Sequence, residues 1–283
     1  MAIETEFLKS LDRLQIILKK RIYADHHGEH VSTHGGEGLV FQDFKPYTPG
    51  DDFRYIDWRV YARTDKFFIK RFEAERNLVV HILVDASASM NFGRKTTKFE
   101  YAAQVGLGFA YIAYRNNERF NMSIFTEHVN AFKAKKGAAN LAYLFDFMGG
   151  LRIEGKSNFL QSMDEYRKHI TSRSMIVFIS DFLYDLAEVE EIISRYHKSQ
   201  VFLIQVLDVE ERDLSLSGDV ILEDAETRDK MRTFVSMRMK NTYQQKLDEH
   251  IAKLKDVCER HGTSFISVST NTPIFEAFYH MFK

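Results

Sequence analysis

Apolar residues follow two different periods along this chain of 283 residues. Short apolar runs of strand length end in polar residues, and between them lie longer stretches in which apolar residues recur every three or four positions. The first pattern predicts strands at 77–84, 120–125, 129–134, 174–179, 200–207 and 263–268. The second pattern predicts helices at 98–116, 140–148, 158–169, 186–197 and 237–260.

Strands that alternate with helices are typical of a doubly wound sheet whose strands run parallel. The link between 120–125 and 129–134 is too short for a crossover helix, so these two strands are expected to pair as a hairpin. We therefore predict an α/β fold with a Rossmann-like, mostly parallel six-stranded sheet that has one antiparallel edge strand.

The first 75 residues follow another pattern. Apolar residues at helical spacing from Phe7 to Ile22 predict an amphipathic helix, and a Gly- and His-rich loop and short extended pieces follow it. We therefore expect two domains. Residues 1–75 form a helix and a small β module, and residues 76–283 form the α/β domain.

Composition bears on the partner class and the cellular location of the protein, but it does not indicate a function. The formal charge is −1, so no overall field favours nucleic acid as a partner. The single cysteine, Cys258, fits a reducing compartment. The N-terminus lacks the pattern of a signal peptide, and no apolar run is long enough to span a bilayer. We expect a cytoplasmic location without direct membrane insertion.

Oxygen-bearing side chains follow the strand predicted at 77–84. Asp85, Ser87 and Ser89 are spaced at i, i+2 and i+4, so in an extended loop they point to one side. Carboxylate and hydroxyl oxygens suit a hard cation such as Mg²⁺ or Mn²⁺. The same string is also common at the start of a helix, where such side chains cap backbone N–H groups.

Two further residues complete the predicted site. Asp181 follows the strand at 174–179, and ligands in open α/β sheets gather beyond the carboxyl ends of the strands. Ser157 lies in a turn between these strands and offers a hydroxyl, although it equally suits the cap of the helix predicted from residue 158. Asp181 also precedes a helix, so a role at the start of that helix is the alternative to metal binding.

This pattern resembles the von Willebrand factor A domains, whose metal-ion-dependent adhesion site reads Asp-x-Ser-x-Ser, then Thr, then Asp. The resemblance implies that Ser87, Ser89 and Ser157 contact the ion, and that Asp85 and Asp181 act largely through water. Ser157 stands where the pattern prefers Thr, so it lacks the stiff χ1 of a β-branched residue. The resemblance also implies an open position on the ion for an acidic residue of a partner protein.

A second block lies in the N-terminal part. Residues 47–58 read Tyr-x-Pro-Gly-Asp-Asp-x-Arg-x-Ile-Asp-Trp, and Ala62-Arg63 follows. With 218–220 and 224–227, this block resembles the bacterial domain of unknown function 58 family. The resemblance implies a partner, a MoxR-type AAA+ ATPase, and chaperone-like complex assembly. The resemblance also implies that ATP chemistry would come from the partner.

The N-terminal block is dense in charges that can pair. We expect an ion-pair network around Trp58, and a structural role explains it best because the module lacks a large core. A docking face for a partner is the alternative, since exposed Arg and Trp are good interface anchors. The residues concerned are Asp51, Asp52, Arg54, Asp57, Trp58 and Arg63.

Other functions find less support in the residues. A magnesium-dependent phosphoesterase using Asp85 as nucleophile would need an acid–base Asp two positions later, where Ser87 stands, so we assign no catalytic residue. The basic N-terminal residues are interleaved with acids, which argues against nucleic-acid binding. His26, His27, His30 and His34 are more typical of a solvated loop than of a zinc site.

Overall fold

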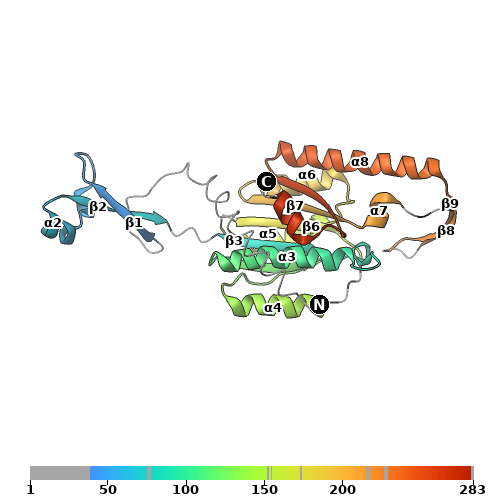
Figure 1. The fold of residues 1–283 in the computed structure, drawn as a ribbon, viewed down its shortest axis with the longest axis horizontal. Helices are drawn as coiled ribbons and strands as arrows, with labels where there is room; N and C mark the ends of the chain where they lie inside the picture. The colour runs from blue at the N-terminus through green and yellow to red at the C-terminus, as the bar shows by residue number, and fades with distance from the viewer. Residues whose placement is uncertain are drawn as a thin grey trace. The chain divides into compact units, whose positions relative to one another are not determined.

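The computed structural model describes residues 39–74, 78–151, 153, 155–172, 174–214, 216, 218–225 and 229–281. The chain divides near residue 77 into two compact units, a small N-terminal one and a larger one that follows it (Figure 1). The helix predicted at 7–22, the four loop histidines and the domain boundary predicted between residues 75 and 76 lie outside the described residues.

The larger unit is a mixed α/β structure built on a mostly parallel six-stranded sheet. Its strand order is β10-β7-β6-β3-β4-β5, and only the pairing of β5 with β4 is antiparallel. The strands are β3 (Val79–Asp85), β4 (Arg119–Phe125), β5 (Val129–Asn130), β6 (Ser174–Ser180), β7 (Gln200–Leu207) and β10 (Ser264–Ser269).

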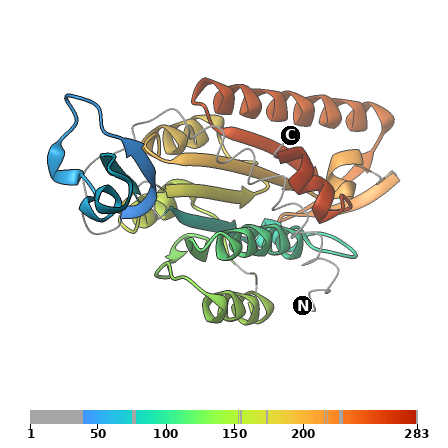
Figure 2. The ribbon, with the colours of Figure 1, turned by 60° about the vertical axis from the view of Figure 1, so that its left-hand side comes forward.

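Helices cover both faces of this sheet. The helices are α3 (Lys98–Arg115), α4 (Ala138–Gly149), α5 (Phe159–Arg167), α6 (Leu186–Arg195), α7 (Val209–Asp213), α8 (Met237–Arg260) and α9 (Ile274–Met281). Figure 2 shows α3 and α8 on opposite sides of the strands. No helix within the described ranges is long and apolar enough to cross a lipid bilayer.

Burial explains the pattern of the central strands. All seven residues of β6 are buried, as are six of the seven in β3, because helices cover both of their faces. On one face, Leu83 and Phe178 pack with Phe159 of α5 and Leu254 of α8. On the other, Phe109 of α3 packs against Phe202 and against Phe278 of α9. Long apolar runs in the sequence therefore mark the centre of the sheet.

Each strand and helix predicted from residue 77 onward is present, but one strand is shorter than predicted, and helices α7 and α9 and one hairpin were not predicted. The strand predicted at 129–134 is only two residues long, because its regular pairing with β4 stops at Asn130 and resumes only as a single bridge between Lys135 and Phe120. The polar stretch after residue 208 contains an unpredicted antiparallel hairpin, β8 (Gly218–Glu223) with β9 (Lys230–Val235). On β8 partly buried and exposed positions alternate, and the Asp219–Arg232 and Glu223–Lys230 ion pairs link the two strands.

The smaller unit is a hairpin with a short helix. Strands β1 (Leu39–Pro46) and β2 (Phe68–Ala74) pair antiparallel, and a bulge shifts the register between Phe41 and Asp43. Between the strands lie a 3₁₀ turn, η2 (Phe53–Tyr55), and helix α2 (Trp58–Thr64).

The direction of winding reverses at β3. The chain passes from β3 to β4 on one side, and later returns to place β6 on the other side of β3. The carboxyl ends of β3 and β6 are therefore neighbours at a switch point, which is where open α/β sheets bind ligands. Val84 pairs with Ile179 in parallel register, so Asp85 lies level with Ser180.

A buried histidine adds a polar network inside the core. The Nδ1 atom of His81 lies 2.7 Å from the Tyr166 hydroxyl, which also accepts from the Asn121 amide at 2.8 Å. Burial and the nearby His169 lower the pKa of His81 to about 4, against the smaller opposing effect of Asn121. His81 is therefore a neutral residue of the core.

This lowered pKa predicts a loss of stability in acid. Below about pH 6.5 the unfolded chain binds a proton at His81 that the folded chain does not bind, so His81 lowers the free energy of unfolding as pH falls towards about 4. The full effect is about 3 kcal/mol. Urea unfolding at several pH values should show a flatter pH dependence for His81→Gln than for the wild type. His197→Gln, at an exposed ring, should leave the slope unchanged; equal slopes in all three proteins would contradict the assignment.

Candidate metal site at the carboxyl edge of the sheet

Asp85 is fully buried at the end of β3, and both of its carboxylate oxygens accept hydrogen bonds. Oδ1 accepts from the Ser87 backbone N–H at 2.8 Å, which folds the loop back over the strand end. Oδ2 accepts from the Ser180 hydroxyl at 2.7 Å and from the Tyr184 hydroxyl. Asp85 thus ties the loop after β3 to the end of β6.

Ser87 and Ser89 bring their hydroxyls together. Their Oγ atoms lie 3.1 Å apart. Neighbouring ligands of an octahedral ion with bonds of about 2.1 Å are separated by about 3 Å, so this spacing suits two ligands of one small cation. Ser87 occupies the cap position of the turn η3 (Ala88–Asn91), but its side chain makes no capping hydrogen bond. The capping interpretation of this string therefore finds no support at Ser87.

Ser157 joins the same group of side chains through Tyr184. The Ser157 Oγ lies 2.7 Å from the Tyr184 hydroxyl, which in turn donates to Asp85. The cap of α5 is the next residue, Asn158, whose side chain accepts from the Gln161 N–H at 3.0 Å. Ser157 is therefore free of the capping role that its position also suited.

Asp181 follows β6 and meets a buried lysine. Its Oδ2 accepts from the Lys98 ammonium at 2.8 Å, and Lys98 also donates to Glu211 Oε1 at 2.7 Å. Gln205 Nε2 donates to the Asp181 backbone carbonyl at 2.9 Å and fixes the chain at this point. The five residues predicted for the site are thus gathered at the ends of β3 and β6, but Asp181 is already paired with a cation.

The electrostatics of this edge favour a further cation. Burial first and the charge of Asp181 second raise the pKa of Asp85. Burial is also the main cause that raises the pKa of Glu211, although Lys98 opposes it. Lys98 pairs with Asp181 and Glu211, whereas Asp85 accepts only from neutral donors, so a cation close to Asp85 and Asp181 would relieve their repulsion.

The available ligands define what such a cation would be. Within the described part of the chain, no three His, Cys, Asp or Glu side chains gather into a metal-binding group. Hydroxyls would therefore have to supply part of the ligand set, which suits Mg²⁺ or Mn²⁺ and not zinc. Ser87 and Ser89, with the two aspartates nearby, fit this requirement.

Four residues of this edge were not predicted from the sequence: Ser180, Tyr184, Lys98 and Glu211. Only Lys98 carries a signal that can be read in advance. It occupies the first position of α3 after the cap Thr97, where the positive end of the helix dipole disfavours a cation. A lysine at that position indicates acidic partners elsewhere in the fold.

The charges predicted for the N-terminal module form close pairs. The Asp52 carboxylate accepts two hydrogen bonds from Arg54 Nε and one of 2.6 Å from its Nη2. Asp51 pairs with the Lys45 ammonium at 2.9 Å. Asp57 caps α2 through the N–H groups of Arg59 and Val60, and its other oxygen pairs with Lys70 at 3.0 Å.

Arg63 and Trp58 lie on α2 itself. Arg63 Nε donates to the backbone carbonyl of Arg59 at 3.3 Å. The indole of Trp58 is 60% exposed and meets the rings of Tyr61 and Phe67 edge-on. The acids of this block therefore hold the turn and the helix, while much of the indole remains open to solvent.

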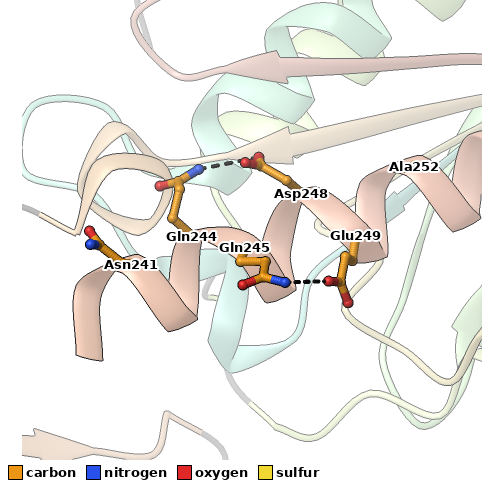
Figure 3. A pocket seen from close by; sticks show the side chains of 6 residues that line it. All are labelled: Asn241, Gln244, Gln245, Asp248, Glu249 and Ala252. Atoms are coloured by element: carbon orange, nitrogen blue, oxygen red, sulfur yellow. Dashed lines mark hydrogen bonds between the residues drawn. The ribbon is translucent and has the colours of Figure 1, made fainter. Parts of the chain in front are cut away.

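A shallow depression on α8 offers a weaker candidate. Figure 3 shows the side chains that line it: Asn241, Gln244, Gln245, Asp248, Glu249 and Ala252. Gln244 donates to Asp248 and Gln245 to Glu249, each one helical turn further along. Four of these side chains thus pair along the helix surface, and all six lie on α8, so the lining comes from one helix face and does not enclose a ligand site.

The contacts of Tyr184 predict that its hydroxyl stabilises the fold. Tyr184→Phe removes one donor to the buried Asp85 carboxylate and the partner of Ser157, which should cost about 1–3 kcal/mol in the free energy of unfolding. Tyr143→Phe, at a half-exposed ring that makes no hydrogen bond within the described residues, should cost under about 0.5 kcal/mol. Equal urea midpoints for the two variants would argue against the Tyr184 contacts.

Comparisons with known proteins identify the family. Uncharacterized proteins of Mycobacterium tuberculosis (Rv1480) and Mycobacterium bovis (Mb1516) are each 24% identical over 267 residues, which is 93% of this chain and 84% of theirs. Among solved structures, the conserved hypothetical protein BatB of Bacteroides thetaiotaomicron has a TM-score of 0.44 at 13% identity, over 72% of this chain and 96% of that one. An aerotolerance-related membrane protein of Bacteroides fragilis has a TM-score of 0.46 at 13% identity, over 72% of this chain and 98% of that one. The family model "Protein of unknown function DUF58" matches residues 43–253, so the chain belongs to the DUF58 family.

Proposed function

We propose that this protein is a metal-dependent protein-interaction module with a von Willebrand factor A-like domain. In this proposal, Asp85, Ser87, Ser89, Ser157 and Asp181 form a metal-ion-dependent adhesion site for Mg²⁺ or Mn²⁺. The observation that carries the proposal is the convergence of two buried aspartates and two hydroxyls 3.1 Å apart at neighbouring strand ends. The strand order, with one antiparallel edge strand, is consistent with the proposed classification.

Each residue has a distinct part in this proposal. Ser87 and Ser89 present hydroxyl ligands from a loop that Asp85 holds in place through the Ser87 N–H. Asp85 and Asp181 supply negative charge close by, and Ser157 supplies a hydroxyl that bonds to the Tyr184 hydroxyl. When bound, a divalent cation with an open coordination position would accept a carboxylate oxygen of a partner protein.

The surroundings of the site suit a protein partner. Phe92 is 42% exposed three residues after Ser89, and Leu183 is 50% exposed two residues after Asp181. Lys156, next to Ser157, is exposed and makes no ion pair within the described part of the chain. Exposed apolar side chains beside a free cation favour an acidic partner segment with apolar neighbours.

The partner class rests on the family resemblance. We propose a MoxR-type AAA+ ATPase as the partner and chaperone-like complex assembly as the shared task. Cys258 is buried as a free thiol, which fits a reducing compartment and supports a cytoplasmic location.

The phosphoesterase alternative is less well supported. A nucleophilic carboxylate needs an oxygen that substrate can reach, whereas Asp85 is fully buried and both of its oxygens accept hydrogen bonds. The residue two positions later is Ser87, which cannot serve as the acid–base carboxyl group. Binding explains this arrangement better than catalysis does.

Removal of one hydroxyl ligand tests the proposed site. Ser89→Ala should weaken Mn²⁺ binding, measured by calorimetry, by about 10–100-fold, because the ion loses a ligand while the buried Asp85 contacts remain. It should also reduce the Mn²⁺-dependent capture of the purified MoxR-type ATPase from the same genome.

The control is Ser172→Ala, an exposed serine just before the other end of β6. It should leave Mn²⁺ affinity and capture unchanged. If the wild type bound no Mn²⁺, or if EDTA and Ser89→Ala both left capture intact, the proposed function would be wrong.

The rim residues give a separate prediction. Leu183→Ser removes an exposed apolar side chain that makes no part of the metal site, so Mn²⁺ affinity should stay unchanged while capture of the ATPase weakens about 10-fold or more. The control is Ile221→Ser, at an exposed position on β8, which should leave capture unchanged; Leu160→Ser is unsuitable because Leu160 packs on the core. If the wild type, Leu183→Ser and Ile221→Ser captured the ATPase equally well, Leu183 would not be part of the interface.

A further inference from the structure

Lys98 is a buried cation at the edge of the candidate site. Its side chain is 1% exposed, and its ammonium contacts Asp181 Oδ2 at 2.8 Å and Glu211 Oε1 at 2.7 Å. These residues come from three elements, the start of α3, the loop after β6 and α7. A backbone hydrogen bond of 2.9 Å from the Lys98 N–H to the Phe92 carbonyl also closes the loop that leads from Ser89 into α3.

A lysine at this place is costly without a compensating role. Burial of an ammonium loses its hydration, and the positive end of α3 adds repulsion. Among the residues that the structure describes, the two carboxylates offset both costs. Removing the lysine would leave Asp181 and Glu211 buried without their shared cation, so its charge is matched to the acids of this edge.

We propose that Lys98 is the internal counter-cation of the candidate metal site and limits the site's affinity for a divalent ion. The inference rests on the proposed function. Without a divalent ion, Lys98 holds Asp181 and compensates its charge. With one, Asp181 is shared between Lys98 and the ion, so binding is weaker than the same ligands would give alone.

Glu211 shares the Lys98 ammonium with Asp181. Its Oε1 accepts from Lys98, while its Oε2 accepts from the Asp208 N–H at 3.1 Å and caps α7. Asp208 is held in turn by the Glu210 N–H and the Thr270 hydroxyl, so Glu211 has a fixed position. Glu211 therefore draws part of the ammonium's charge away from Asp181 and favours binding of a divalent ion.

This division of charge gives opposite expectations for two substitutions that break the same ion pair. Lys98→Met removes the competing cation, so Mn²⁺ should bind about tenfold more tightly than to the wild type. Glu211→Gln keeps the cap of α7 but leaves Lys98 to Asp181 alone, so Mn²⁺ should bind more weakly. Calorimetry with Mn²⁺ alone measures both affinities, and thermal unfolding in EDTA measures both stabilities.

A merely structural role predicts something else. If the pair only held the fold together, both variants would unfold at lower temperature and both would bind Mn²⁺ equally or less well than the wild type. Competition predicts that Lys98→Met is destabilised in EDTA but gains more in melting temperature from saturating Mn²⁺ than the wild type does.

Failure of the inference can be told apart from failure of the proposed function. If the wild type binds Mn²⁺ and Lys98→Met binds it no more tightly, the role of Lys98 is wrong and the metal site stands. If neither protein binds Mn²⁺, both ideas fall. If Lys98→Met does not fold, the double variant Lys98→Met/Glu211→Gln removes one of the two unpaired acids, and it should bind Mn²⁺ more tightly than Glu211→Gln alone.

Discussion

The carboxyl edge of the sheet is organised by two buried aspartates whose charges repel each other. Asp85 ends β3, and Asp181 follows the neighbouring strand β6. Their mutual repulsion raises the pKa of Asp85 beyond the effect of burial alone. Neighbouring donors compensate this charge: two hydroxyls and a backbone N–H donate to Asp85, and an ammonium pairs with Asp181.

The fold explains why these groups meet. The winding of the sheet reverses at β3, so strands that are almost a hundred residues apart in the sequence become neighbours. The parallel register then sets the end of β3 level with the end of β6. The helices on both faces keep water from the strands, and the polar edge is left as the place where charge must be balanced.

The sequence was informative where apolar patterns are long and less so where contacts are distant. The strand at 200–207 and the helix at 237–260 have the predicted bounds, because each is a long segment with one clear period. The hairpin β8–β9 was missed because polar and apolar residues do not alternate along β8, where Val220, Ile221 and Leu222 are consecutive, and its ion pairs form only across the folded strands. The Asp-x-Ser-x-Ser string placed three residues correctly at a strand end. Tyr184 and Glu211 lie in segments without a motif, and only tertiary structure brings them to Asp85 and Lys98.

Under the proposed function, a divalent cation binds between these hydroxyls and carboxylates. The most direct measurement is the anomalous scattering of crystals of the full chain grown or soaked with Mn²⁺. We expect a peak within bonding distance of the Ser87 and Ser89 hydroxyls, beside Asp85 and Asp181, with the Tyr184 hydroxyl displaced or shared. A saturated crystal that showed Mn²⁺ only elsewhere, with Ser87 and Ser89 still bonded to each other, would contradict the proposed function.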